Sequence, residues 1–310
     1  MINGFNELSY FFPEKYRTKW EKWNLGISEL EEIRIRVNKH VRIYSGNQIK
    51  TDIVYGEKEL EEIFRYFCRD SIYAYEEERK KGYMTLKGGH RVGIAGEFVV
   101  GDDGRYIVKY IRYINIRVAH EIKNIATNIL RHLYDQDKDL LNTLIISPPG
   151  IGKTTLLRDL IRLISNGVGG YKEYNVGLVD ERGEIAGAHR GSAMLDCGEC
   201  TDVVTGIDKY NGINILLRAF APQVIAIDEI GAENDAKAIF NAGISGCKII
   251  ATIHGKNCSD VFSKIELKEL INKAIFQRYI IIYKDDKLER MGDIYDSKGV
   301  FLCSEGLQRQ

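Results

Sequence analysis

Residues 143–164 read Thr143-Leu-Ile-Ile-Ser-Pro-Pro-Gly-Ile-Gly-Lys-Thr-Thr-Leu-Leu-Arg-Asp-Leu-Ile-Arg-Leu-Ile164, and this stretch decides the fold. Its first part is an apolar run that is too short for a helix and stops at a Pro/Gly turn. After the turn, apolar residues recur at helical spacing until Gly167 ends the pattern. The stretch therefore predicts a strand, a glycine-rich loop and a helix in succession.

The loop of this stretch has the chemistry of a phosphate-binding loop. Its backbone N–H groups are expected to point inward as an anion-binding nest, reinforced by the helix N-terminus. Lys153 is expected to reach the β- and γ-phosphates of a nucleoside triphosphate, and the Thr154 hydroxyl to ligate Mg²⁺. Gly152 allows close backbone approach because it has no Cβ. The residues expected to bind nucleotide are Ser147, Pro148, Pro149, Gly150, Ile151, Gly152, Lys153, Thr154 and Thr155.

One position departs from the G-x-x-x-x-G-K-[ST] pattern, because Ser147 takes the place of the first glycine. If a positive φ is needed there, a residue with a side chain costs about 1–3 kcal/mol. Ser147 could instead be the last residue of the strand, in ordinary β geometry. A chance Gly-Lys-Thr on a turn is the alternative to the motif as a whole, and the flanking strand and helix argue against it.

Length and composition restrict the class of protein. The chain has 310 residues, of which 44% are hydrophobic and 28% charged, so it can bury a core and form one large domain or two ordinary ones. Lys+Arg and Asp+Glu both number 44, and this balance argues against a protein whose main function is to bind nucleic acid. The N-terminus lacks the pattern of a signal peptide, and no apolar run approaches the ~20 residues that span a bilayer. We expect a soluble cytoplasmic protein, or one that is peripheral to a membrane through a partner.

The six cysteines are dispersed, with one C-x-x-C pair at Cys197 and Cys200. Such a pair could be half of a zinc site or a redox pair. A structural zinc needs two more ligands, which only distant residues such as His189, Cys247 or His254 could supply. Reduced cytosolic thiols are the favoured interpretation.

The chain is expected to form two domains. Residues 1–118 predict a smaller mixed α+β domain, with a helical aromatic-rich segment over 5–30, strands over 32–37 and 41–44, and a helix over 57–70. A further helix is expected around 76–81, followed by a hairpin whose strands flank the Gly101–Gly104 turn. Residues 119–310 alternate between strand and helix, starting with a helix over 121–134, which predicts a mostly parallel α/β sheet.

Polar residues follow several strands of this second domain at the point where each strand ends. Ligands of open parallel sheets bind beyond the carboxyl ends of the strands. The apolar run 224–227 ends in Asp228-Glu229, a Walker-B-type pattern in which Asp228 is expected to hold Mg²⁺ through water and Glu229 to orient or deprotonate the attacking water. His254 follows another strand and could sense the γ-phosphate, or could be a buried core histidine.

An acidic cluster, Asp180-Glu-Arg-Gly-Glu184, follows the strand over 174–179. Glu181 or Glu184 could place a second carboxylate near the attacking water, or the cluster could be a solvated loop. The pattern alone does not separate Glu229 from Glu181 and Glu184 as the carboxylate that activates water.

The order of these motifs resembles that of the secretion-superfamily ATPases, the motors of type II and type IV secretion and of pilus machines. The chain resembles most closely the family of stage III sporulation AA proteins. The segments that carry this resemblance span nearly the whole chain: 71–75, 82–93, Val179-Asp-Glu-Arg182, 200–204 and Ile227–Gly231, with Gly88-Gly-His-Arg-Val-Gly93 the most specific.

The resemblance implies a RecA-like ATPase domain that binds ATP and Mg²⁺. It also implies that the protein works as a ring, and we expect a hexamer. It implies a cytoplasmic protein of the mother cell in a spore-forming bacterium, which energises a channel complex of membrane proteins. N-domain arginines reach the nucleotide in related motors, which suggests Arg91, Arg112 or Arg117 here, and Arg218 matches a recurrent arginine of the superfamily. Cys200 and Ser147 depart from the family pattern.

Two other functions are compatible with the residues. The first is a nucleotide-gated protein that binds nucleic acid, with Arg34, Arg36, Lys39 and Arg42 as its basic footprint, against which the zero net charge counts. The second is a scaffold that binds ATP without hydrolysing it, and the presence of both Asp228 and Glu229 weighs against it.

Overall fold

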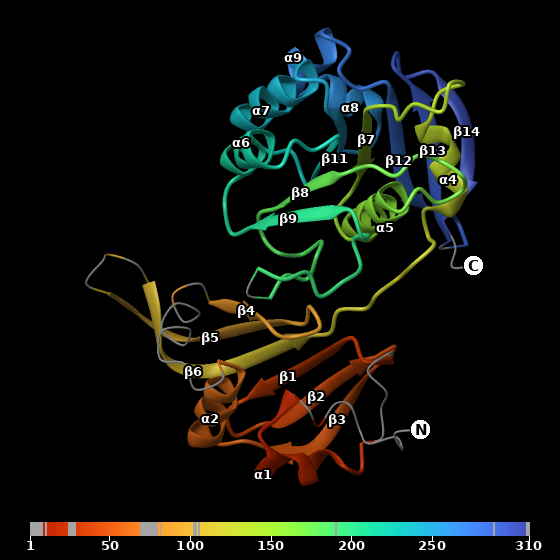
Figure 1. The fold of residues 1–310 in the computed structure, drawn as a ribbon. Helices are drawn as coiled ribbons and strands as arrows, with labels where there is room; N and C mark the ends of the chain where they lie inside the picture. Colours follow the sequence, from red (N-terminus) through yellow and green to blue (C-terminus); the bar gives the residue numbers. More distant parts are fainter. Residues whose placement is uncertain are drawn as a thin grey trace. The chain divides into compact units, whose positions relative to one another are not determined.

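The computed structural model describes residues 9, 11–23, 29–68, 80, 82–101, 104, 106–189, 191–287 and 289–307. The chain divides into two compact units, Met1–His120 and Glu121–Gln310 (Figure 1). We propose that these units are the two domains expected from the sequence.

The N-terminal unit is built on a six-stranded antiparallel sheet with strand order β3-β2-β1-β6-β5-β4. Its strands are β1 Glu32–Arg36, β2 His40–Ser45, β3 Asn47–Val54, β4 Tyr83–Thr85, β5 Arg91–Val100 and β6 Tyr106–Arg117. Strand β1 shows why the alternating pattern was informative, because Ile33 and Ile35 are fully buried while Arg34 and Arg36 are not. The expected hairpin is present as β5 and β6, and residues 102, 103 and 105 of its turn lie outside the described residues.

The helices of this unit are α1 Glu14–Arg17, the 3₁₀ turn η2 Thr18–Trp20 and α2 Glu57–Phe67. Leu60, Ile63, Phe64 and Phe67 of α2 are buried, as the amphipathic pattern predicts. The aromatic segment also packs into this core, since Trp20 stacks on Phe12 and donates to the Tyr55 hydroxyl at 2.9 Å. The helical pattern expected over 5–30 is present only in short pieces in its described part, namely the one-turn helix α1 and 3₁₀ turns that include η2. The helix expected around 76–81 lies almost wholly outside the described residues.

The last residues of the N-terminal unit are hydrogen-bonded to residues that directly precede β1 and β5. The Val118 N–H donates to Glu31 O at 2.9 Å, and the Ala119 N–H donates to His90 Nδ1 at 3.1 Å. The His120 Nε2 atom lies 2.8 Å from Leu30 O. The chain is therefore bound to this unit up to His120.

The C-terminal unit contains an eight-stranded, mostly parallel sheet with strand order β14-β13-β12-β7-β11-β10-β8-β9 (Figure 1). Neighbours from β12 to β9 run parallel, whereas β13 and β14 are added antiparallel at one edge. The strands are β7 Thr143–Ser147, β8 Val176–Asp180, β9 Thr201–Thr205, β10 Val224–Ile227, β11 Lys248–His254, β12 Arg278–Lys284, β13 Arg290–Asp296 and β14 Phe301–Gly306. The predicted α/β fold class is confirmed.

Helices cover both faces of this sheet. Helix α5 Lys153–Ser165 and the short α4 Thr127–Leu130 pack on one face, in an apolar cluster with Ile145, Leu178 and Ile250. On the other face, residues of α6 Lys209–Ala219, α7 Glu233–Ile244, α8 Cys258–Phe262 and α9 Lys268–Asn272 pack against Leu144, Ile146 and Ile225. Successive strand residues thus alternate between two cores, which explains the continuous apolar runs of β7 and β10.

The sequence patterns failed in the less apolar parts of this unit. The helix expected over 121–134 is wrong in its first half, because α4 begins only at Thr127 and is followed by the 3₁₀ turn η4 Arg131–Leu133. The 3₁₀ turn η5 Ile265–Leu267 directly precedes α9. Strands β3, β4, β9, β13 and β14 were not predicted. Among the described residues, every helix is too short or too polar to cross a bilayer.

Candidate functional site

The phosphate loop connects β7 to α5 through two residues with left-handed backbone. Gly150 has φ 79° and Gly152 has φ 112°, and α5 begins at Lys153. A residue with a Cβ is strained in this region, so both glycines are required by the turn. Ser147 is a fully buried strand residue in register with His254 of β11. Ser147 thus has the strand geometry considered as one of its two interpretations.

The Lys153 ammonium is only slightly exposed and has neutral hydrogen-bonding partners. Its Nζ lies 2.6 Å from His254 Nδ1 and 3.3 Å from Ser147 O. Burial lowers the pKa of Lys153, and the charges of Asp228 and Glu229 act in the opposite direction. Because an ammonium only donates, Nδ1 of His254 must accept, which places the ring proton on Nε2. That nitrogen lies 3.2 Å from Glu229 Oε1. Lys153, His254 and Glu229 therefore form one chain of polar contacts.

Asp228 and Glu229 are held by the buried hydroxyl of Thr252 on the neighbouring strand β11. This hydroxyl donates to Asp228 Oδ1 at 2.7 Å and accepts the Glu229 N–H at 2.8 Å. The Thr154 hydroxyl, in the first turn of α5, donates to Asp228 Oδ2 at 3.3 Å. Glu229 has φ 50°, an unfavourable backbone for a residue with a side chain, and such strain is common at functional sites. Thr252 lies two residues before His254 on β11.

The donor set at the end of the sheet fits a nucleoside triphosphate with a divalent cation. A hydroxyl and a carboxylate, from Thr154 and Asp228, are the oxygen ligands that Mg²⁺ prefers. Lys153 is a buried cation whose hydrogen-bonding partners in the described part of the chain are neutral. A cation in that position is best stabilised by an anion that completes its coordination. The residues that would hold the metal are therefore Thr154 and Asp228.

Asp180 organises the acidic loop rather than facing the triphosphate position. Its buried carboxylate accepts the N–H groups of Glu184, Ile185 and Ala186 at 2.9, 3.0 and 2.9 Å. Burial raises the pKa of Asp180 to about 6, although these hydrogen bonds act in the opposite direction. The buried Arg158 of α5 donates to Ile185 O at 2.9 Å, and its pKa is lowered by burial. The loop is thus fixed from two sides.

The other candidate carboxylates are directed elsewhere. Glu181 is exposed and forms an ion pair with Lys209 at 2.5 Å, and Glu184 is exposed on the loop that Asp180 caps. Among the described residues, no hydrogen bond or ion pair joins Glu181 to Lys153, Asp228 or His254. The convergent group is therefore Lys153, Thr154, Asp228, Glu229 and His254, with Thr252 added by the structure.

Arg218, the candidate arginine of the C-terminal unit, does not lie in this convergent group. Arg218 is exposed in the last turn of α6, which leads to the start of β10 and hence to the opposite edge of the sheet from the phosphate loop. In the N-terminal unit, Arg112 forms an ion pair with Glu57, and Arg91 lies over the Tyr83 ring, 4.4 Å from its centroid. Arg117 ends β6 and is exposed. A role for any of them at a nucleotide stays a prediction.

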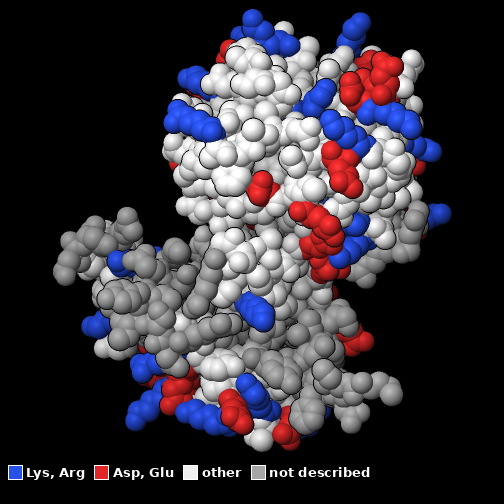
Figure 2. Space-filling view, in the orientation of Figure 1, with Lys and Arg blue, Asp and Glu red and all other residues white. Residues whose placement is uncertain are grey.

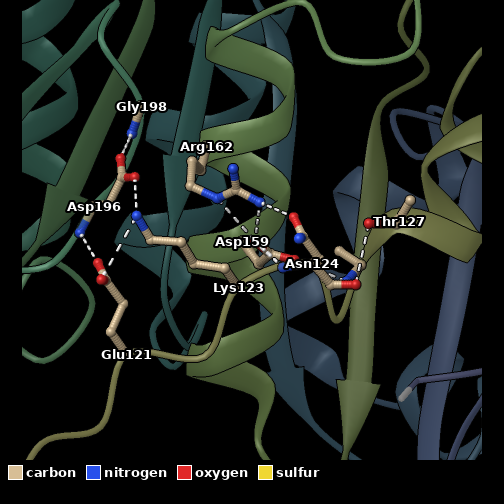
Figure 3. Close-up of polar contacts among 9 residues, drawn as sticks. Glu121, Lys123, Asn124, Thr127, Asp159, Arg162, Asp196 and Gly198 are labelled. Atoms are coloured by element: carbon tan, nitrogen blue, oxygen red, sulfur yellow. Dashed lines mark hydrogen bonds and ion pairs between the residues drawn. The ribbon is translucent and has the colours of Figure 1, made fainter. Parts of the chain in front are cut away.

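The phosphate-loop helix is anchored in its second turn by the buried Asp159 (Figure 3). This carboxylate accepts the backbone N–H groups of Asn124 at 3.0 Å and Ala126 at 2.9 Å. Arg162 donates to the same carboxylate through Nε at 3.0 Å and Nη2 at 2.7 Å, and Nη2 also bonds Asn124 Oδ1 at 2.8 Å. The predicted helix cannot start at Glu121, because these N–H groups bind Asp159 and Asn124 has φ 63°.

The preceding residues are held by the loop that follows β8 (Figure 3). Lys123 forms an ion pair with Asp196 at 2.6 Å, and Glu121 Oε1 accepts the Asp196 N–H at 2.8 Å. Asp196 itself accepts the Gly198 N–H at 3.0 Å. The segment 121–126 is therefore bound to the C-terminal unit along its length.

The cysteines do not build the zinc site considered above. All six are free, and Cys197 is buried in an apolar cluster that raises its thiol pKa to about 12. In the described part of the chain, Cys197 and Cys200 belong to no group of three potential metal ligands. Such a group is formed by His132, Cys303 and Glu305. Its carboxylate is already paired with Arg131 at 2.6 Å, and a guanidinium so close disfavours a cation.

Solved structures with the same fold define the class. The ATPase DotB of Yersinia pseudotuberculosis matches with a TM-score of 0.60 at 14% identity, over 96% of this chain and 80% of that one. The pilus retraction motor PilT with bound ADP matches with a TM-score of 0.56 at 12% identity, over 86% and 78%. The chain thus has the fold of the secretion ATPases, an α/β phosphate-loop fold.

The sequence comparisons define the family. The family described as "Sporulation stage III, protein AA" matches residues 7–302. The stage III sporulation protein AA of Bacillus subtilis (strain 168) is 36% identical over 300 residues, covering 95% of this chain and 96% of that protein. The chain belongs to the stage III sporulation protein AA family, and the resemblance noted in the sequence is confirmed.

The Asp159 anchor generates a stability prediction. Asp159→Ala leaves two backbone N–H groups and the Arg162 guanidinium without their acceptor, so the free energy of unfolding should fall by about 2–4 kcal/mol. Urea denaturation followed by circular dichroism measures this change. Thr127→Ala is the matched control, because it removes only an exposed hydrogen bond to Asn124 O. A loss below 1 kcal/mol for Asp159→Ala would contradict the role of the anchor.

Asp180 generates a pH prediction. Its pKa is about 6 in the folded chain against an ordinary value of 3.8, so the folded state holds the proton more tightly. The stability from this group is fully present below pH ~3.8 and is lost as the pH rises through about 6, a change of about 3 kcal/mol at most. We expect the stability difference between wild type and Asp180→Asn to shift in favour of the variant from pH 4 to 6.5 and to be constant above 7.

Urea titrations at pH 4.5, 5.5, 6.5 and 7.5 measure that difference. Asp202→Asn, which changes an exposed carboxylate on β9, is the matched control. A difference between wild type and Asp180→Asn that does not vary with pH would exclude the titration of Asp180 in this range.

Proposed function

We propose that this chain is a Mg²⁺-dependent ATPase that works as a ring, in the form of a hexamer, and energises a membrane channel or secretion-like complex during endospore formation. The observation that carries the proposal is the convergence of Lys153, Thr154, Asp228, Glu229 and His254 at one edge of the sheet. The name of the Bacillus subtilis relative supports the link to sporulation. The proposal places the protein in the cytoplasm of the mother cell, peripheral to the membrane through its partners.

The residues of the phosphate loop would bind and orient the triphosphate. The N–H groups over 150–154 would donate to its oxygens, and Lys153 would neutralise charge on the β- and γ-phosphates. Thr154 and Asp228 would hold Mg²⁺, which supplies further charge neutralisation on the same oxygens. When Lys153 turns to a phosphate, its contact with His254 Nδ1 is exchanged for one with the nucleotide, so the histidine is placed to respond to the bound state.

Glu229 is the carboxylate that we assign to the attacking water. Its Oε1 lies against His254 Nε2, and its backbone is fixed by Thr252 beside the metal-binding Asp228. Glu181 instead pairs with Lys209. A carboxylate at this position orients water and accepts its proton as the γ-phosphoryl group departs.

Self-association is supported by the surface around α6. Large apolar side chains are exposed on or next to this helix at Tyr210, Ile215 and Phe220, each at least 40% exposed, in the neighbourhood of Arg218. An exposed apolar surface of this kind is typical of a protein interface. In a ring, Arg218 would serve the site of a neighbouring subunit, and one of Arg91, Arg112 and Arg117 would approach the nucleotide.

The nucleic-acid alternative gains no support from the surface. Lys and Arg side chains are interspersed with Asp and Glu on the face that Figure 2 shows. Arg34 of the suggested basic footprint forms an ion pair with Glu32. A small basic footprint with one arginine already paired, on a chain of zero net charge, offers a phosphate backbone little excess positive charge.

The proposal is tested by ATP turnover. Lys153→Ala should lower kcat/KM by about 10²-fold or more, since it removes charge stabilisation of the transferred phosphoryl group. Glu229→Gln should lower kcat by about 10²–10³-fold and leave ATP binding nearly unchanged. Phosphate release measures turnover, and a fluorescent ATP analogue measures binding.

Lys268→Ala, which removes an exposed lysine of α9, is the matched control for the loss of charge. Because a ring is expected to be the active form, turnover should be followed over a range of protein concentrations. Equal turnover of wild type and Lys153→Ala at every concentration would refute the ATPase proposal.

A further inference from the structure

Arg290 is placed beside the phosphate loop by the antiparallel hairpin of β12 and β13, which lies next to β7. Strand β12 runs parallel to β7, with Ile281 in register with Ile146, and it ends at Lys284. The chain then turns back, and Arg290 opens β13 directly opposite Lys284. Arg290 therefore lies at the carboxyl ends of the parallel strands, as does the loop that follows β7. None of the sequence motifs pointed to this residue.

The Arg290 guanidinium lies face-on against Gly152. A Cβ placed on Gly152 would be 3.5 Å from Cζ of Arg290 and 3.7 Å from both Nε and Nη1. With a delocalised C–N bond of about 1.33 Å, these are the distances of a point directly above Cζ. One face of the guanidinium plane thus covers the last loop residue before Lys153, and the opposite face is directed away from the loop.

The guanidinium has no carboxylate partner in the described part of the chain. Arg34, Arg112, Arg131 and Arg162 each form an ion pair, whereas no ion pair or side-chain hydrogen bond involves Arg290 among the described residues. Arg290 is nevertheless half-buried. A planar cation with free N–H groups, held beside a phosphate loop, is suited to stack on an aromatic ring system.

The position of Arg290 relative to the other site residues indicates which part of a nucleotide it meets. Strand β7 has β11 on one side and β12 on the other. His254, Asp228 and Glu229 lie at the ends of β11 and β10, and they mark the side of the terminal phosphate and the metal. Arg290 lies on the β12–β13 side, so it faces the opposite end of a bound nucleotide.

We propose that Arg290 is a binding residue for the nucleobase, which stacks on the guanidinium face opposite Gly152. This inference rests on the proposed nucleotide-binding function and deepens it. Every base has a π face, so this contact adds affinity for nucleotides without selecting strongly among bases. In this arrangement Lys153 binds the phosphates of the nucleotide, and Arg290 binds its base.

The test separates base from phosphate recognition by comparing ADP with tripolyphosphate, both with Mg²⁺. Arg290→Ala should weaken ADP binding about ten-fold, the range expected for a desolvated cation–π stack, and leave tripolyphosphate binding within two-fold. Arg290→Lys should also weaken ADP binding several-fold, because it keeps the charge and loses the plane. Lys287→Ala, on the same β12–β13 hairpin, is the matched control for charge and should change neither affinity. Isothermal titration calorimetry measures both ligands, and circular dichroism checks that the variants are folded.

The possible failures are distinguishable. Equal losses of ADP and tripolyphosphate affinity would show that Arg290 acts on phosphates, and unchanged ADP affinity in Arg290→Ala would show that it does not contact the nucleotide. Either result overturns this inference and leaves the ATPase proposal intact. Absence of ADP, ATP and tripolyphosphate binding by the wild-type chain would overturn both.

Discussion

The two oxygens of the Asp228 carboxylate are shared between hydroxyls from two different elements, Thr252 on β11 and Thr154 on α5. This pair of contacts connects the end of one strand, its neighbour and the helix of the phosphate loop. The Thr252 hydroxyl also accepts the Glu229 N–H, so the strained corner after β10 is held by the same side chain. The arrangement of the proposed site depends on these few bonds. Side chains held by such bonds have little conformational freedom to lose on binding.

In the part of the chain that the structure describes, the site holds a buried ammonium and nearby carboxylates that are not paired directly with one another. Lys153 is buried against neutral partners, and burial lowers its pKa. Asp180, deeper in the same unit, is a buried acid whose pKa is raised to about 6, and it lies close enough to Asp228 for the two charges to repel. Both groups favour the arrival of positive charge near the carboxylates and of negative charge near the lysine. A metal–triphosphate complex supplies the two together.

Much of the C-terminal fold could be predicted because its central strands are buried on both faces. Runs such as 143–146 and 224–227 are wholly apolar and end at polar residues, so the strands and their functional ends were visible in the sequence. Strands β9 and β13 were missed because Thr201–Thr205 and Arg290–Asp296 carry polar residues that fit an edge of a sheet as well as a loop. The segment 121–126 was misjudged because its backbone bonds to Asp159, which is distant in the chain.

The same reasoning explains which site residues were found. Lys153 and Thr154 follow the glycine-rich loop after β7, Asp228 follows β10 and His254 ends β11, so local pattern places them. Arg290 reaches the loop through a hairpin on the far side of β12, and no local signal reports such a register. The ion pair of Glu181 with Lys209 likewise depends on where α6 packs. The sequence alone could therefore not show which carboxylate activates the water.

The residues on both sides of the boundary between the two units are hydrogen-bonded within their own units. Val118, Ala119 and His120 are bonded to the N-terminal unit, and Glu121 is already bonded to the loop after β8. Because Asp159 joins Asn124 and Ala126 to helix α5, a tilt of that helix would move the segment with which the C-terminal unit begins. The phosphate loop and the unit boundary are thus mechanically continuous.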